Sequence, residues 1–249
     1  MPAEAALLEA FELHSPDRIR KALAAGASAT TAIKGKRPID ILIEMYLRSS
    51  RFAECLQILL DSGATVGDPL LEAILLDDDA GLRRLLSGSG EYLQRRLSPL
   101  CAYTSCRGVT ALHICAEFNS VSCGRVLLES GADVNARADV DGDGVGGQTP
   151  IFHTVNSNGN YCRPMMEMLV EAGADLDVRV RSLLWGESMS WETVVYEVTP
   201  ISYAQCGLYQ QFHRGEQDVY SNIDYLFRRS YNRASRSRNV PNRYLANGH

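Results

Sequence analysis

The sequence predicts a mostly helical repeat protein, and a periodic feature carries that prediction. Gly-Ala pairs follow leucine-rich segments at intervals of 37, 68 and 42 residues, and the interval of 68 spans two periods of 34. A glycine after each segment can take the left-handed conformation that closes a helix. Self-similarity at such a period is typical of solenoids, in which neighbouring helical units bury a shared core. The pairs occupy residues 26–27, 63–64, 131–132 and 173–174.

A second motif recurs ahead of the last two Gly-Ala pairs. Thr110-Ala111-Leu112-His113 precedes the third pair, and Thr149-Pro150-Ile151-Phe152-His153 precedes the fourth. These motifs and the helix ends that follow them resemble the ankyrin repeat, a turn and two antiparallel helices of about 33 residues. The resemblance implies an all-α ankyrin-repeat solenoid of about six helix-turn-helix units. It is strong over residues 109–230 and weaker over residues 3–108.

Six units within residues 1–230 account for this pattern. The first begins with the segment Ala5–Ala10 and is expected to form an N-terminal cap, because an end repeat must expose one face to water. The second has Arg37-Pro38-Ile39-Asp40 at the motif, the third keeps only Asp68–Ala73, and the sixth opens on Thr199-Pro200. The expected bounds are about 3–35, 36–67, 68–108, 109–147, 148–198 and 199–230.

The resemblance assigns structural roles to the motif residues. The threonine or its neighbour caps the first helix of a unit, and proline suits the first turn of that helix. The histidine links adjacent loops by hydrogen bonds, so we expect framework roles for both motif histidines rather than catalytic ones. The structural set is Thr110, His113, Thr149, Pro150, His153, Thr199 and Pro200.

An insertion over residues 177–198 lengthens the fifth unit. Its two ends alternate apolar and charged residues, and Gly186 lies between them as a turn residue. This pattern predicts an extended β-hairpin that projects from the finger between units five and six. One face is expected to hold Val178, Val180, Val194 and Tyr196, and the other to pair Arg179 and Arg181 with Glu192 or Glu197.

Both tryptophans of the chain lie near the expected hairpin tip. Tryptophan and arginine dominate the energetics of protein interfaces, and loops inserted into repeat arrays often form the binding face. The alternative is that the two indoles pack onto the hairpin or onto unit six. The candidate partner-binding residues are Arg179, Arg181, Trp185, Trp191 and Tyr196.

A shorter insertion runs over residues 139–147. Asp139, Asp141 and Asp143 begin it in the manner of an EF-hand calcium loop, with carboxylates at alternate positions. The twelfth position, which should be a bidentate glutamate, is Pro150. A solvated, glycine-rich turn is therefore the favoured interpretation, and calcium binding is kept as a lesser alternative.

A zinc site is not expected. Cys101, Cys106, His113, Cys115 and Cys123 fall within 23 residues, but their spacings do not match the paired Cys-x-x-Cys knuckles of structural zinc sites. Free cysteine is among the most buried residue types, so core positions are the better interpretation.

The distribution of charge along the chain argues against some classes of binding partner. The net charge of −5 combines a body of about −11 (residues 1–224) with six arginines and no acid after residue 224. We expect the acidic body to repel nucleic acid and anionic membranes, and residues 231–249 to form a basic, flexible tail. The chain shows no signal peptide and no apolar run long enough to span a bilayer, so a cytoplasmic protein with reduced thiols is expected.

No nucleophile elbow, phosphate-binding loop or His-Glu-x-x-His motif is present in the sequence, and no enzymatic activity or cofactor is expected. The sequence favours a non-catalytic protein–protein interaction module that binds its partner across the finger tips and concave face of units four to six. One alternative is a homo-oligomerising structural module that uses the 177–198 hairpin. A calcium-responsive module is the lesser alternative.

Overall fold

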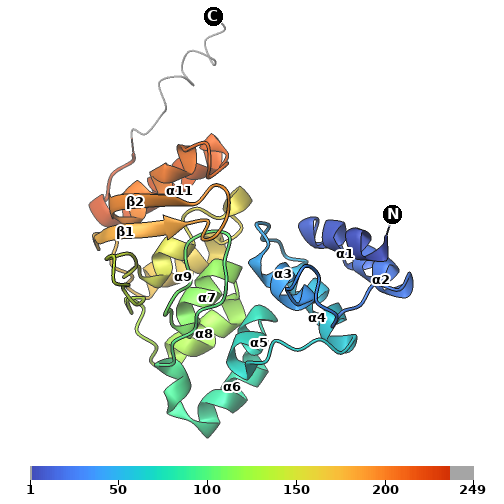
Figure 1. Ribbon diagram of the computed structural model, residues 1–249. Coiled ribbons are helices and arrows are strands. Elements are labelled where there is room, and N and C mark those ends of the chain that lie inside the picture. Colours follow the sequence, from blue (N-terminus) through green and yellow to red (C-terminus); the bar gives the residue numbers. More distant parts are fainter. Residues whose placement is uncertain (1, 236–249) are drawn as a thin grey trace, which may run out of the picture.

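The computed structural model describes residues 2–235, and its helices follow one another in successive pairs along a curved row (Figure 1). Residues 236–249, which hold most of the predicted tail, lie outside the described part. The helices of the first half are α1 (Ala3–Glu12), α2 (Pro16–Ala24), α3 (Pro38–Glu44), α4 (Phe52–Asp61), α5 (Pro69–Leu75), α6 (Asp79–Gly88) and the 3₁₀ turn η1 (Gly90–Leu93).

The second half combines helices with a two-stranded sheet. Its helices are α7 (Ala111–Phe118), α8 (Val121–Glu129), α9 (Arg163–Glu171), α10 (Pro200–Gln205) and α11 (Glu216–Tyr231), with the 3₁₀ turns η2 (Pro150–His153), η3 (Asn158–Asn160) and η4 (Cys206–Leu208). Strands β1 (Val180–Trp185) and β2 (Thr193–Val198) lie between α9 and α10 in the chain. None of the helices in residues 2–235 combines the length and apolarity needed to cross a bilayer.

The glycines of the four Gly-Ala pairs close helices as predicted. Gly26, Gly63, Gly131 and Gly173 have φ angles of 98°, 91°, 89° and 92°. Glycine takes this left-handed conformation readily because it has no Cβ to clash with the preceding turn. Their chain positions therefore mark the ends of α2, α4, α8 and α9.

The segment after Thr149 differs from the expected helix. Only the short 3₁₀ turn η2 forms there, and η3 follows it before α9 begins. The motif carries one more residue between its threonine and its histidine than the corresponding motif at Thr110. Side chains three and four residues apart point in different directions, so the insertion changes which way His153 faces.

The predicted hairpin is present, but it does not project. Strands β1 and β2 pair antiparallel, with Val180 opposite Val198 and Trp185 opposite Thr193. All of β1 except Arg181 is buried. The expectation of an extended finger was wrong because the continuous run Leu183–Trp185 makes β1 apolar on both faces, as in strands that are covered on both sides.

A long connection between α6 and α7 covers the tip of the hairpin. The backbone N–H of Ser105 donates to Leu184 O at 3.0 Å, and the N–H of Gly186 donates to Tyr103 O at 2.9 Å. Residues 101–106 are all buried although they form neither helix nor strand. This irregular segment is therefore held inside the molecule by contacts with β1 and with side chains of the core.

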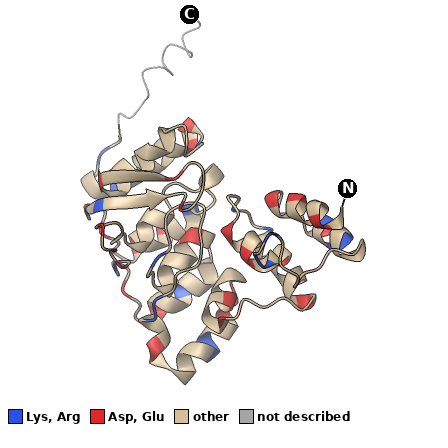
Figure 2. Cartoon of the chain, viewed as in Figure 1, with Lys and Arg blue, Asp and Glu red and all other residues tan. Residues whose placement is uncertain are grey.

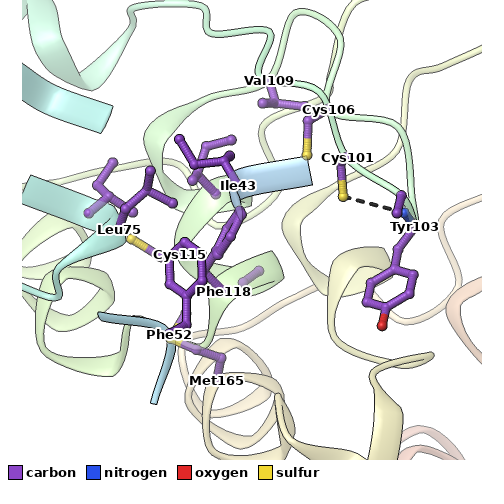
Figure 3. Packing of buried hydrophobic residues seen from close by; sticks show 14 of the residues in the cluster. Ile43, Phe52, Leu75, Cys101, Tyr103, Cys106, Val109, Cys115, Phe118 and Met165 are labelled. Atoms are coloured by element: carbon purple, nitrogen blue, oxygen red, sulfur yellow. Dashed lines mark hydrogen bonds between the residues drawn. The ribbon is translucent and has the colours of Figure 1, made fainter. Parts of the chain in front are cut away.

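The N-terminal helices pack against α7 through the segment between α3 and α4. Phe52 and Phe118 have ring centroids 5.1 Å apart, and Figure 3 shows Ile43 beside them in the same apolar cluster. The guanidinium carbon of Arg48 lies 4.2 Å from the centroid of the Phe118 ring. The loop before α4 thus brings the charged Arg48 into the centre of the molecule, and the helices on either side of it bring Ile43 and Phe52.

Candidate functional site: the hairpin surface and a buried polar centre

The two tryptophans of the hairpin have different environments. Trp185 is 1% exposed, stacks on Phe212 with ring centroids 4.2 Å apart, and stacks on Tyr103 at 5.1 Å. The guanidinium of Arg214 lies 5.0 Å from the Trp185 ring centroid. The assignment of Trp185 as a surface anchor was therefore wrong, because its large apolar ring is covered by Phe212 and Arg214 and by the 101–106 segment.

Trp191 remains at the surface, with 36% of its area exposed. Its indole lies over Gly186, where an added Cβ would come within 2.7 Å of the ring. Gly186 has a φ of 69°, so both its conformation and its lack of a side chain are needed at this turn. Trp191 also borders a pocket of about 390 Å³, together with Tyr46, Trp185, Phe212 and Arg214.

The other candidate residues of the hairpin are exposed. Arg179 and Arg181 face solvent, and Tyr196 on β2 is 70% exposed. The expected pairs with Glu192 or Glu197 do not form among the described residues. Instead the Glu192 carboxylate accepts from the Ser188 N–H at 2.7 Å. The Glu197 backbone has a φ of 53°, which interrupts the regular strand opposite Arg181.

A groove of about 630 Å³ follows the outer edge of β2. Residues 193–198 form one wall, and Ser202, Gln205 and the η4 segment up to Tyr209 form the other. Within residues 2–235, β2 pairs with β1 alone. Tyr196 and Tyr209, which are 70% and 50% exposed, flank this groove. The sequence interpretation missed Tyr209, because nothing in its neighbourhood shows that η4 returns beside the hairpin.

The aspartate-rich loop is tied down by arginines and by its own backbone. Asp141 Oδ1 accepts from the N–H groups of Asp143 and Val145, at 3.0 and 2.9 Å. Its second carboxylate oxygen lies 3.7 Å from Arg107, and Asp139 lies 3.9 Å from Arg96. The three carboxylates do not converge on a common point among the described residues, so this arrangement lends no support to a calcium loop.

Calcium is therefore expected to leave the thermal stability unchanged. A specific site would raise the melting temperature with calcium concentration, because a ligand that binds the folded state stabilises it. The measurement is a calorimetric titration with calcium for the wild type and for Asp141→Asn. A calcium-dependent rise in the wild type that the variant lacks would restore the metal hypothesis.

The two motif histidines have different partners. The His113 ring contacts the Thr110 hydroxyl at 2.8 Å through Nδ1 and the Gln148 carbonyl at 3.1 Å through Nε2. It therefore links two successive turns, as the resemblance implies. His153 makes no such link, and its Nδ1 lies 3.1 Å from Glu117 Oε2 in the interior.

The motif threonines also differ. Thr199 and Ser202 form a reciprocal cap at the start of α10, with Pro200 in the first turn. Pro150 likewise occupies the first position of η2. The buried Thr149 hydroxyl has no hydrogen-bond partner, so its predicted capping role was wrong. The 3₁₀ geometry of η2 explains this difference, because it does not present the amides of a full helical turn.

Buried histidines predict a loss of stability in mild acid. Burial, with smaller contributions from Arg48 and Arg51, lowers the pKa of His14 to about 4. Burial followed by the proximity of His153 lowers the pKa of His113 well below its usual value. Both rings are neutral in the folded protein, whereas in the unfolded chain they bind protons below pH 6.5. Stability is thus fully present above that pH and falls as the pH drops.

For His14 alone, the free energy of unfolding is expected to fall by about 1 to 2 kcal/mol between pH 7.5 and 5. Urea denaturation across this range measures the loss. His14→Asn is the matched variant, because asparagine tolerates the positive φ of 42° at this position. An identical pH dependence in the variant would contradict the assignment.

A buried polar centre lies where the N-terminal helices meet α7. Arg48 and Glu117 are 3% and 2% exposed, and Arg48 Nη2 lies 3.3 Å from Glu117 Oε1. The same nitrogen lies 3.3 Å from Cys101 Sγ. Burial alone would lower the pKa of Arg48, but its close contacts with Cys101 and Glu117 raise it above its usual range. The guanidinium is therefore charged.

Three further side chains complete this centre. Cys106 Sγ lies 4.0 Å from His153 Nδ1, and the Cys162 thiol donates to the Glu117 carbonyl at 3.4 Å. All seven cysteines are buried free thiols. A hydrogen bond with Cys101, followed by burial, holds the pKa of Cys106 well above its usual range.

The sequence interpretation missed Arg48 and Glu117. Glu117 is the one acidic residue in the apolar helix α7, and an acid in such a helix is a signal of a buried partner. Arg48 gave no comparable signal, because it lies in the connection between α3 and α4 and not on an apolar helix. Elsewhere basic and acidic residues are interspersed along the helices (Figure 2), and the pairs they form there are mostly exposed.

Comparison with known protein families identifies the family to which this chain belongs. No curated protein matches the chain. The family model for ankyrin repeats, in three copies, matches residues 42–180, which is more than half of the 249 residues. The match begins near the end of α3 and runs through α9, including the two turns that His113 links. By this match and by its successive helical pairs, the chain belongs to the ankyrin repeat family.

Proposed function

We propose that this protein is a non-catalytic binding module that holds an extended segment of a protein partner against the outer edge of β2. Units four to six, residues 109–230 in the proposed division, carry the surface. The observation behind this proposal is the groove between β2 and η4, which combines a strand edge that has no second neighbour among residues 2–235 with two exposed tyrosines.

The chemistry of the groove favours a peptide backbone with apolar side chains. An added strand gains main-chain hydrogen bonds along a free edge, and pockets for alternate side chains give specificity. Tyrosine provides a large contact area with little loss of conformational freedom. Arg179 immediately precedes β1, Arg181 lies on it, and both are exposed, so acidic residues beside the apolar ones would complement them.

The test compares three matched tyrosine variants. Tyr196→Ala and Tyr209→Ala are each expected to weaken partner binding about tenfold or more, as for residues at the centre of an interface. Tyr46→Ala is the control, because Tyr46 is 49% exposed but lies on the segment between α3 and α4. Affinity capture with quantitative mass spectrometry, followed by titration of the captured partner, measures the effect.

Circular dichroism confirms that each variant is folded. Equal binding by the wild type and by both groove variants would refute the groove as the site. Loss of binding in Tyr46→Ala alone would move the site to the pocket beside Trp191.

The same strand edge favours one alternative, a homo-oligomer. Two copies of β2 can pair antiparallel about a twofold axis, which is a common route to symmetric dimers. Sedimentation at several protein concentrations separates the two functions. A mass that rises to two chains, and that Tyr196→Ala returns to one chain, would support self-association and not a different partner.

A further inference from the structure

The buried polar centre contains a set of metal-ligating atoms from three segments of the chain. The thiols of Cys101 and Cys106 and a carboxylate oxygen of Glu117 lie within 4.8 Å of one another, the only such group among the described residues. Figure 3 shows the two cysteines side by side, with both sulfur atoms pointing to the same side of the segment. His153 Nδ1 adjoins this group, 3.1 Å from Glu117 Oε2 and 4.0 Å from Cys106 Sγ.

We propose that this centre is a structural zinc site, in which Cys101 Sγ, Cys106 Sγ, Glu117 Oε and His153 Nδ1 bind one Zn²⁺ ion. Thiolate, imidazole and carboxylate are the ligands that zinc prefers, and structural sites take four of them. The proposal is independent of the groove along β2, since none of the four residues lines it.

The structure brings three of the four ligands together, and the fourth, His153, approaches the group from one side. Zinc bonds of about 2.3 Å to sulfur and about 2.0 to 2.2 Å to nitrogen or oxygen place neighbouring ligand atoms roughly 3.3 to 3.8 Å apart. The contact between His153 and Glu117 is slightly shorter than this range, and that between His153 and Cys106 is slightly longer. His153 lies outside the group of atoms within 4.8 Å of one another, so rotation of its ring toward Cys101 is part of the proposal.

The charges also balance. One Zn²⁺ ion displaces two thiol protons to solvent and forms two zinc–thiolate bonds, so the net charge of the buried centre does not change. His153 would bind the metal through Nδ1 as a neutral ring that carries its proton on Nε2. Two thiolates and one carboxylate leave the zinc centre with one negative charge. Arg48, 3.3 Å from both Cys101 Sγ and Glu117 Oε1, supplies the matching positive charge.

The position in the fold gives such a site a role. Residues 101–106 are buried and irregular, so no helix or complete sheet ladder holds them in place. Zinc would join this segment to the end of α7 and to η2. The cysteines and Glu117 are each at most 3% exposed, which fits a closed structural site without an open position for water or substrate.

The scattered origin of the ligands explains why sequence spacing does not show them. Four residues separate Cys101 from Cys106, which is not the spacing of a paired Cys-x-x-Cys motif. Glu117 and His153 come from separate elements. Glutamate and histidine at these two positions belong to no motif with a recognisable zinc-ligand spacing. His153 reaches the centre because of the extra residue in its motif.

The experiment uses the full chain expressed in zinc-supplemented medium and purified with a reductant. Because a closed site binds metal during folding, the protein is also unfolded with chelator and refolded with Zn²⁺ or Co²⁺ salts. Native mass spectrometry is expected to find one zinc ion per chain. Co²⁺ is expected to give tetrahedral visible bands and a thiolate-to-cobalt charge-transfer band, and added zinc is expected to raise the melting temperature.

Cys106→Ala is expected to weaken zinc binding by at least about a hundredfold, since loss of an outer-shell partner alone costs 10- to 100-fold. Cys115→Ala is the matched control, because Cys115 is a buried thiol on α7 that lies outside the group. Should Cys106→Ala fail to fold, the thiolate-to-cobalt band of the wild type decides. Three results would each overturn the proposal. The first is a wild type without that band, and the second is a Cys101–Cys106 disulfide that takes up no metal after reduction. The third is unchanged zinc binding in a folded Cys106→Ala.

Discussion

Glu117→Gln is expected to lower the free energy of unfolding by about 3 to 5 kcal/mol. The substitution preserves the shape of the side chain and removes only its charge. Arg48 then remains charged, 3% exposed and without a counterion within the apolar environment of Phe118 and Tyr103. The desolvation cost of the guanidinium is no longer offset, and this loss dominates the effect.

An exposed ion pair provides the matched control. Glu129 lies at the end of α8, and its carboxylate is 3.0 Å from Arg83, with both side chains about half exposed. The contact is slightly shorter than that of Glu117 with Arg48, yet Glu129→Gln is expected to cost less than about 1 kcal/mol because water screens the pair. Urea denaturation in chelator-containing buffer measures both variants, so that any bound metal does not contribute.

A double-mutant cycle completes the test. Arg48→Met alone leaves the Glu117 carboxylate buried without its cation, whereas the double variant removes both charges. The double variant is therefore expected to be more stable than the sum of the single effects predicts. Additive effects, or equal losses for Glu117→Gln and Glu129→Gln, would show that the buried pair is not charged.

This ion pair has a consequence for how the repeats hold together. Arg48 comes from the segment between α3 and α4, and Glu117 from the end of α7. The pair therefore joins the N-terminal helices to the middle of the solenoid, beside the contact of Phe52 with Phe118. In a repeat array each unit mostly contacts its neighbours, so we expect weakening of this contact to loosen the N-terminal units first.

The parts of the fold that follow local rules could be predicted from the sequence. Glycine at positions 26, 63, 131 and 173 closes helices because the left-handed conformation is a local property of the residue. Alternating residues and a glycine turn likewise predicted the hairpin. His113 could be assigned to the link between turns, because the resemblance carries that role on the Thr-x-x-His spacing.

The parts of the fold that depend on distant contacts could not be predicted from the sequence. Whether the hairpin projects or docks is decided by Phe212, Tyr103 and Arg214, which lie outside it in sequence. The centre around Glu117 gathers residues from five segments, and no periodicity brings Arg48 next to Cys101. The direction of His153 was missed for a local reason, the extra residue after Thr149, which the sequence does show.

Trp185→Ala is expected to destabilise the protein by about 3 to 5 kcal/mol, as for a large buried aromatic residue. The substitution removes the central ring of a stack in which Trp185 lies between Tyr103 and Phe212. It also removes one of the two aromatic rings beside the Arg214 guanidinium, whose centroids lie 4.6 and 5.0 Å away. The cavity lies at the junction of β1 with the 101–106 segment, so the effect combines lost burial with a loosened hairpin.

Trp191→Ala is the matched comparison, since these are the two tryptophans of the chain. Trp191 is 36% exposed and rests on Gly186, so its removal is expected to cost less than about 1 kcal/mol. Trp185→Phe should fall between the two alanine variants, because it keeps an aromatic ring in the stack. Thermal and urea unfolding measure all three variants.

Fluorescence gives an independent measure of the same contrast. Trp191→Phe leaves Trp185 as the remaining indole, and its emission is expected at short wavelength because the ring is shielded from water. Trp185→Phe leaves the half-exposed Trp191, with emission at longer wavelength. Similar emission from the two variants, or equal stability losses for the two alanine variants, would mean that Trp185 does not occupy the core. If the contrast holds, the hairpin is anchored by Trp185, and the edge of β2 is presented on a rigid support, which a strand-adding partner requires.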